Sequence, residues 1–139
     1  MKKRVFGRKL SRDRDSRKAL IRGLIASLVK YGKITTTKAK AKTIQSEVDQ
    51  YLTDLREDTI AARRRIQSNL GNDTVTTKLL FQNYLKITAK RTSGFTRIIN
   101  LPRRKGDSAE IVTISFVDEI KPKKKKVKEN AKNNTAKKS

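Results

Sequence analysis

The excess of positive charge, and its position along the chain, constrains this protein more than any other feature of its sequence. The 139 residues include 36 Lys and Arg but only 13 Asp and Glu, which gives a formal net charge of +23. Residues 1–30 carry 11 basic and 2 acidic side chains, and residues 121–139 carry 9 lysines and a single glutamate. The 16 basic and 10 acidic residues between them are close to the balance of an ordinary protein. Because self-repulsion destabilises a compact chain of this charge, we expect a folded middle that works in contact with a polyanion.

This pattern predicts three segments: a basic N-terminal arm (1–12), a globular domain (13–120) and a disordered lysine-rich tail (121–139). The tail has too few apolar side chains to bury a core. It is either a solubilising tail or a flexible arm that follows nucleic-acid phosphates, and the sequence leaves both interpretations open.

The first apolar segment predicts a helix of about 16 residues. Between Leu20 and Val29, the apolar side chains recur at helical spacing and form one stripe. Asp13 or Asp15 is expected to cap the start of this helix. Gly32 suits the left-handed position beyond its end.

Three further helices are expected before the pattern changes. Thr37, Asp58 and Asp73 are their predicted caps, and Gly71 would end the third helix. The fourth would place Val75 and four later apolar residues on one face.

Alternating and β-branched residues predict three strands, at Ile34–Thr37, Phe95–Leu101 and Ala109–Val117. A basic turn from Pro102 to Asp107 would join the last two. The expected order is α-β-α-α-α-β-β. The sequence therefore predicts an α+β domain with a small mixed three-stranded sheet and about four helices.

The residue types argue against an enzyme. The chain contains no cysteine and no histidine, which excludes disulfides, Cys or His metal sites and His-dependent triads. We interpret Asp13 with Asp15 as capping and internal charge pairing, and residues 54–58 as a solvated helix end with a cap. Asp107 with Glu110 does not fit a nuclease carboxylate pair, because Ile111 and Val112 follow where that motif has a lysine. No phosphate-binding glycine loop is present. The sequence thus predicts no catalytic site, metal, cofactor or small-molecule substrate.

Basic side chains gather in three clusters, within residues 2–22, 63–65 and 97–105. A solvated face is the usual explanation for any one such cluster. The first and third have few acidic neighbours, whereas Glu57 and Asp58 precede the second and could partly neutralise it.

Two of the few aromatic residues, Phe6 and Phe95, lie beside glycine and arginine. Each could stack on an unpaired base. Each could equally anchor its loop to the core, and we favour this second role for Phe95.

Two ordered blocks of residues carry a specific resemblance. The first block contains Gly7-Arg8-Lys9-Leu10, Arg17-Lys18-Ala19-Leu20 and Thr36-Thr37-x-x-Lys40-Ala41-Lys42. The second contains Gly94-Phe95-Thr96-Arg97-Ile98, Gly106-Asp107-x-Ala109 and Phe116-Val117-Asp118. In both, the chain resembles bacterial large-subunit ribosomal proteins of the L17 family, over residues 1–118 or so and only loosely over 59–92.

The resemblance implies a mixed helix–sheet domain that is a structural component of the large ribosomal subunit. It implies binding to the main ribosomal RNA of that subunit, beside neighbouring ribosomal proteins near the nascent-chain exit region. The lysine-rich tail is longer than is usual in the family, so the resemblance implies no role for it.

Charge and resemblance together predict where RNA binds. The arm and first helix should lie on phosphates, because the planar fork of arginine makes bidentate phosphate bonds. The hairpin turn would supply a second contact, so that separate RNA segments are clamped together. The expected RNA-binding residues are Lys2, Lys3, Arg4, Arg8, Lys9, Arg12, Arg14, Arg17, Lys18, Arg22, Lys38, Lys40, Arg97, Arg103, Arg104 and Lys105, with Arg8, Arg12, Arg14, Arg17 and Arg22 foremost.

Two other classes of protein share this charge. A nucleoid-type, non-specific DNA-binding protein is the main alternative, although the chain shows no helix-turn-helix spacing and no dimer seam. A membrane-surface protein is less favoured, because the apolar stripes are needed for the core and no stretch approaches the roughly 20 apolar residues of a spanning helix. We expect a soluble, cytoplasmic protein located on the ribosome.

Overall fold

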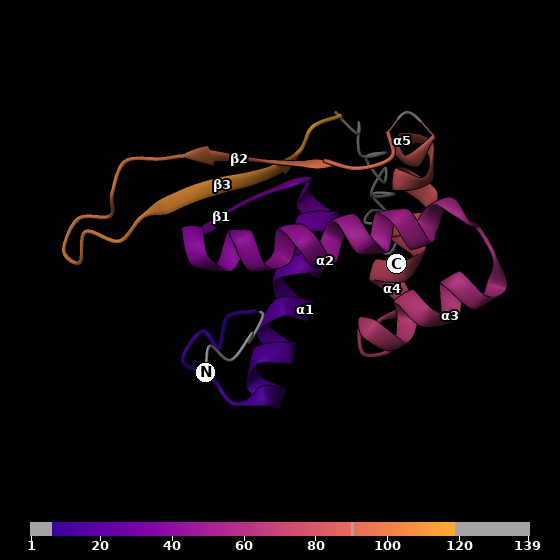
Figure 1. Ribbon diagram of the computed structural model, residues 1–139, viewed down its shortest axis with the longest axis horizontal. Helices are drawn as coiled ribbons and strands as arrows, with labels where there is room; N and C mark the ends of the chain where they lie inside the picture. The colour runs from indigo at the N-terminus through magenta and orange to yellow at the C-terminus, as the bar shows by residue number, and fades with distance from the viewer. Residues whose placement is uncertain (1–6, 90, 119–139) are drawn as a thin grey trace, which may run out of the picture.

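The computed structural model describes residues 7–89 and 91–118 and has the α+β architecture that the sequence predicts (Figure 1). The helical elements are α1 (Arg14–Tyr31), α2 (Lys38–Arg56), α3 (Ile60–Asn69) and a fourth stretch made of α4 (Thr74–Leu79), the π-helix η1 (Leu80–Tyr84) and α5 (Leu85–Thr88). The strands are β1 (Lys33–Thr37), β2 (Thr96–Asn100) and β3 (Ile111–Phe116). The predicted order of elements is confirmed. The predicted lysine-rich tail, residues 121–139, lies outside the described residues.

The sheet has the order β1-β3-β2, and both of its pairings are antiparallel. The expected mixed sheet is wrong in this detail. A short hairpin joins β2 to β3, and β1 runs in the same direction as β2 but is separated from it by β3. Ile114 of the central strand pairs with Ile34 on one side and with Ile98 on the other.

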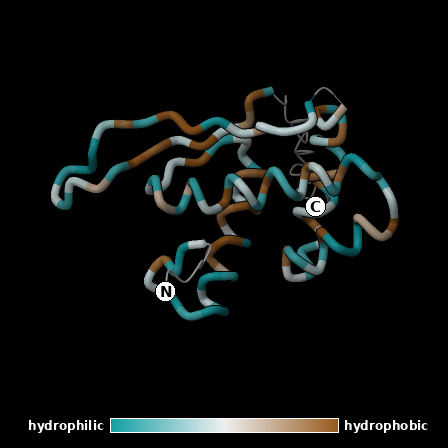
Figure 2. The backbone as a smooth tube through the Cα atoms, viewed as in Figure 1, coloured by the Kyte–Doolittle hydropathy of each residue, from teal (hydrophilic) through white to brown (hydrophobic). Residues whose placement is uncertain are grey.

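The core lies between one face of this sheet and the helices (Figures 1 and 2). Val112, Ile114 and Phe116 alternate toward it, as predicted, and all three are buried. The Tyr84 ring packs against Phe116 with 4.4 Å between ring centroids. Its hydroxyl donates a hydrogen bond of 2.8 Å to the carbonyl of Val29 near the end of α1. Figure 2 shows apolar residues concentrated where these layers meet.

Two of the predicted helix boundaries are confirmed in atomic detail. Gly32 has a left-handed φ of 76°, and its N–H donates to the carbonyl of Leu28 at 2.8 Å. The Asp73 carboxylate accepts hydrogen bonds from the N–H groups of Val75 and Thr76, which begins α4. The hydroxyl of Thr76, which also donates to this carboxylate, and these two N–H groups hold the pKa of Asp73 below its usual range.

Other capping predictions are wrong. Thr59, and not Asp58, caps α3, since its hydroxyl accepts a hydrogen bond of 3.1 Å from the N–H of Ala62. Asp58 has a left-handed φ of 42° in the turn between α2 and α3, and its carboxylate pairs with Arg63. Thr37 precedes α2 as expected, but its side chain makes no capping hydrogen bond.

The fourth helical stretch departs from simple helical periodicity. Val75 is 66% exposed, contrary to its expected place on the apolar face, while Thr76 and Thr77 are buried. The Thr77 hydroxyl donates to the carbonyl of Asp73 at 2.7 Å. The π-helical turn η1 then adds a residue to the helical repeat, so that Ile87 beyond it is buried. In the described part of the chain, we find no helix with both the length and the apolar character that a membrane span requires.

Candidate nucleic-acid interface

The described part of the N-terminal arm, residues 7–12, is a turn that leads into α1. Leu10 has a left-handed φ of 52°. The N–H of Arg12 donates to the carbonyl of Lys9 at 3.2 Å, and its guanidinium donates to the carbonyl of Leu10 at 2.9 Å. This turn leaves Arg8, Lys9 and Arg12 exposed. Lys2, Lys3 and Arg4, which complete the predicted arm, lie outside the described residues.

The first half of α1 carries basic side chains, whereas its buried residues lie in the second half. Arg14 and Lys18 are exposed, and Arg17 is half-buried. None of the three forms an ion pair with another described residue. Asp13 and Asp15 also form none, and the Asp13 side chain makes no capping hydrogen bond. The predicted charge pairing of these two aspartates is not found within the described residues, and Arg14, Arg17 and Lys18 have no carboxylate partner there.

Arg22, one of the foremost candidates, contacts the end of α3. Its Nε donates a hydrogen bond of 2.8 Å to the carbonyl of Asn69, 47 residues away. Its guanidinium also lies against Gly71, where a Cβ atom would come within 3.0 Å of Nη1. The carbonyl end of a helix favours a cation, so Arg22 ties α1 to α3. This contact was not predicted, because no local pattern joins the two segments.

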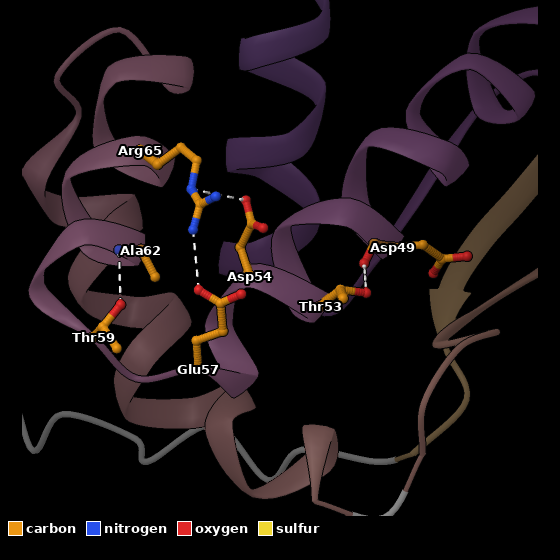
Figure 3. Close-up of polar contacts among 7 residues, drawn as sticks. All are labelled: Asp49, Thr53, Asp54, Glu57, Thr59, Ala62 and Arg65. Atoms are coloured by element: carbon orange, nitrogen blue, oxygen red, sulfur yellow. Dashed lines mark hydrogen bonds and ion pairs between the residues drawn. The ribbon is translucent and has the colours of Figure 1, made fainter.

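The arginines of α3 are largely neutralised from within the chain (Figure 3). Arg65 pairs with Glu57 at 3.0 Å and with Asp54 at 3.8 Å, and both carboxylates belong to the end of α2 and the turn that follows it. Arg63 pairs with Asp58 at 2.8 Å. The interpretation that Glu57 and Asp58 partly neutralise the second basic cluster is confirmed, since they pair with two of its three arginines.

Arg63 has a second contact. Its guanidinium lies over the Phe81 ring of η1, with 4.4 Å between Cζ and the ring centroid. This stacking holds the side chain against the helical layer, which further restricts its use in binding a separate molecule.

The other predicted cluster consists of Arg97 in β2 and residues 103–105 in the turn between β2 and β3. Arg97, Arg103 and Lys105 are exposed and form no ion pair within the described residues. Arg104 makes a two-pronged contact with the Asp107 carboxylate, and its Nε lies 3.0 Å from Oδ1. These hydrogen bonds lower the pKa of Asp107 to about 2. Three of the four predicted cations here thus remain available.

Of the two predicted lysines at the start of α2, one pairs with a carboxylate and the other does not. Lys38 pairs with Glu110 at 3.1 Å, and this contact holds the pKa of Glu110 below its usual range. Lys40 forms no ion pair within the described chain and lines a hollow beside the hairpin.

Phe95 anchors its loop to the core, as favoured from the sequence. It is buried, and its N–H donates to the Asp49 carboxylate at 3.3 Å. The N–H of Val117 donates to the carbonyl of Phe95 at 2.9 Å. Phe95 is therefore not available to stack on a base, and Phe6 lies outside the described residues.

The structure places the two available clusters toward the same end of the molecule. The hairpin extends beyond the helices, and the start of α1 and the arm lie away from α3, which occupies the other end (Figure 1). Figure 2 shows hydrophilic residues along both the hairpin turn and the first turns of α1. The sequence did not predict that the face of the sheet opposite the helices is uncovered, although strand alternation carries that signal.

The sequence of this chain is similar to those of known proteins. The family described as "Ribosomal protein L17" matches residues 20–117. A protein named "Large ribosomal subunit protein bL17" from Thermodesulfovibrio yellowstonii is 40% identical over 134 residues, covering 96% of this chain and 100% of that protein. Proteins of the same name from Persephonella marina and Clostridium botulinum are 36% and 38% identical, covering 85% and 79% of this chain and 96% of each relative. The match to the Thermodesulfovibrio yellowstonii protein reaches into the lysine-rich segment. This chain is therefore not alone in having a C-terminal extension.

Proposed function

Because the chain belongs to the ribosomal protein L17 family, we propose that it is a structural component of the large ribosomal subunit that binds large-subunit ribosomal RNA. It acts on the ribosome in the cytoplasm, beside neighbouring large-subunit proteins near the nascent-chain exit region. It performs no catalysis, since its contribution is to hold RNA in a fixed arrangement.

One observation supports the RNA-binding part of this proposal: within the described residues, several basic residues without a carboxylate partner lie together in the arm and the first half of α1, and Arg103 and Lys105 lie in the hairpin turn. The arm with the first half of α1 forms one cluster, and the hairpin turn forms the other. Phosphates supply the missing negative charge, and their neutralisation releases condensed counterions, which drives binding.

The two clusters act as a clamp. Arg8, Arg12 and Arg14 lie on one stretch of RNA backbone, and Arg103 and Lys105 lie on another. The core fixes the separation of the two stretches, because residues of α1, α2 and the sheet belong to one buried cluster. Helical RNA presents mainly its shape, phosphates and 2′-hydroxyls to such contacts.

Arg22, Arg104 and Lys38 position parts of this clamp and contribute less to phosphate binding than the unpaired cations. Arg22 positions α1 against α3 through Asn69. Arg104 and Lys38 shape the hairpin and its junction with α2 through Asp107 and Glu110. Each donates to a partner inside the chain and therefore gains less from a phosphate.

Co-sedimentation tests the proposal. The full chain should be recovered in stoichiometric amount with large ribosomal subunits after a moderate salt wash. Recovery with chromosomal DNA instead would overturn the proposal in favour of a nucleoid-type protein, and recovery with lipid would favour a membrane-surface protein.

A further inference from the structure

One face of the sheet is not covered by the helices. Strand alternation and the two registers place nine side chains on the face opposite the core. They are Lys33, Thr35, Thr37, Arg97, Ile99, Leu101, Ile111, Thr113 and Ser115. None of them is buried, and none is acidic. Figure 1 shows the helices on the other side of the three strands.

This uncovered face changes in character along the strands. Lys33 and Arg97 both pair with Ser115, so one row across the sheet has a cation at each edge. The next row has Thr35 and Thr113, whose hydroxyl oxygens are 3.3 Å apart, and Ile99.

The third row is more apolar and lies at the base of the hairpin. Ile111 pairs with Thr37, and its carbonyl accepts a hydrogen bond of 2.9 Å from the N–H of Leu101. Ile99 and Leu101 are 51% and 39% exposed. Four residues separate the cationic row from this apolar row, which is about 13 Å along a strand.

A hollow lies at the apolar end. Thr37, Ile111 and Leu101 line it together with Pro102, and Lys40 and Arg104 add positive charge at its wall. Arg104 is paired with Asp107, and Glu110 nearby is paired with Lys38. Lys40 is thus the cation of the hollow without a carboxylate partner within the described residues.

We propose that this uncovered face and its hollow bind an unpaired segment of RNA. The inference rests on the proposed function and assigns a type of RNA structure to one surface. Bases contact Ile99, Leu101 and Ile111, while phosphates contact Lys40 at one end and the pair Lys33 and Arg97 at the other. The threonine hydroxyls between them bond to ribose or phosphate oxygens.

The chemistry favours an unpaired segment over an RNA helix. A helix hides the faces of its bases by stacking, whereas an unpaired strand exposes both base faces and phosphates. The side chains of Ile99 and Leu101 offer apolar contact that only exposed bases can use. An acidic protein segment is less suited, because this face combines its cations with hydroxyl donors spaced along an extended strand.

Binding of three RNA probes to the full-length chain tests the inference. The probes are an oligouridylate, an oligomer of the same length and charge that lacks bases, and an RNA duplex. Replacement of Ile99 and Leu101 together by Thr keeps the β-propensity of the strand and removes apolar surface. The double variant should bind the oligouridylate about five- to tenfold more weakly, because base contact is lost. Its affinity for the other two probes should change less than about twofold, since those contacts are electrostatic.

A matched control uses two exposed apolar residues of the helices. Ile60 and Val75 are 71% and 66% exposed, and their joint replacement by Thr should leave all three affinities unchanged. Circular dichroism of both double variants should show the wild-type fold, because no buried contact is altered.

Three results would contradict the inference. An unchanged oligouridylate affinity, or an equal loss for all three probes, would show that bases do not contact this face. An unchanged oligouridylate affinity with loss of the double variant from large subunits would assign the face to a protein neighbour. Failure of the wild-type chain to bind any of the probes would instead count against the proposed function itself.

Discussion

Two arginine-rich helices of this protein use their charge differently. α3 carries three consecutive arginines, residues 63–65, and the structure pairs two of them with carboxylates at the end of α2 and the turn after it. The arm and the first half of α1 carry a similar density of basic residues, yet Arg14, Arg17 and Lys18 have no carboxylate partner in the described chain. The number of basic residues therefore does not locate an RNA-binding surface. We propose that the positions of the carboxylates locate it.

The energetics of the α3 pairs support this distinction. The side chains of Arg63, Arg65, Asp58 and Glu57 are all roughly half exposed. Such surface pairs contribute about 0–1 kcal/mol to the free energy of unfolding. Their main consequence is that each arginine already has an anionic partner, so it gains less free energy when it binds a phosphate.

The largest expected effect comes from removing the unpaired cations. Replacement of Arg8, Arg12 and Arg17 together by Ala should weaken binding to large-subunit RNA by at least about tenfold. The slope of log affinity against log salt should become shallower by roughly two, because about three phosphate contacts are lost. Filter binding over a series of salt concentrations measures both quantities.

Replacement of residues 63–65 by Ala is the matched control, since it removes the same number of charges. It should change the salt slope by less than about one, because two of these arginines are already neutralised. Equal salt slopes for the two triple variants would show that α3 and the arm with α1 do not differ in their contact with phosphates.

A smaller effect is expected at the residue that joins the two regions. Replacement of Arg22 by Ala should lower the free energy of unfolding by about 1 kcal/mol, since the hydrogen bond to Asn69 is lost. Urea denaturation measures this change. The salt slope of RNA binding should stay at its wild-type value, and a slope reduced by a full phosphate contact would show that Arg22 lies on RNA.

Removing the carboxylates should partly convert α3 into a basic surface. Glu57→Gln with Asp58→Asn releases Arg65 and Arg63, and Asn suits the left-handed backbone at position 58. RNA affinity should rise about two- to threefold, with a steeper salt slope. An unchanged or reduced affinity in the same binding assay would show that the carboxylates do not limit this helix.

The smallest effect concerns the hairpin, where Arg104 is paired as the α3 arginines are. The contact lowers the pKa of Asp107 to about 2, from an ordinary value of 3.8. A lowered folded-state pKa means that the pair supports the turn above pH 3.8 and that this support is lost as pH falls through about 2. The Asp107 carboxyl resonance followed by NMR should titrate near pH 2, and at a higher pH in the Arg104→Gln variant, in which only the N–H of Ala109 still donates to this carboxylate. A midpoint near 3.8 in the wild-type chain would show that the pair does not form in solution.

Local patterns predicted the elements of the fold well. The apolar stripe ending before Gly32 and the alternation through Val112, Ile114 and Phe116 depend on neighbouring residues in sequence, and both are confirmed. The cap at Asp73 is of the same kind, because its bonds reach only two and three residues along the chain.

Features that depend on distant residues could not be predicted in this way. Arg22 was grouped with the RNA-binding arginines because nothing near it in sequence indicates Asn69 as its partner. The pairing of Lys38 with Glu110 depends on the antiparallel alignment of β1 and β3. Val75 was misplaced because a π-helical turn and buried threonines alter the helical repeat around it.

A map of RNA–protein cross-links on intact large ribosomal subunits tests the central claim most directly. The described arm, the first half of α1 and the hairpin turn should each cross-link to RNA, and the peptide that carries residues 63–65 should not. Cross-links concentrated on α3, with the arm and hairpin unmodified, would contradict the account.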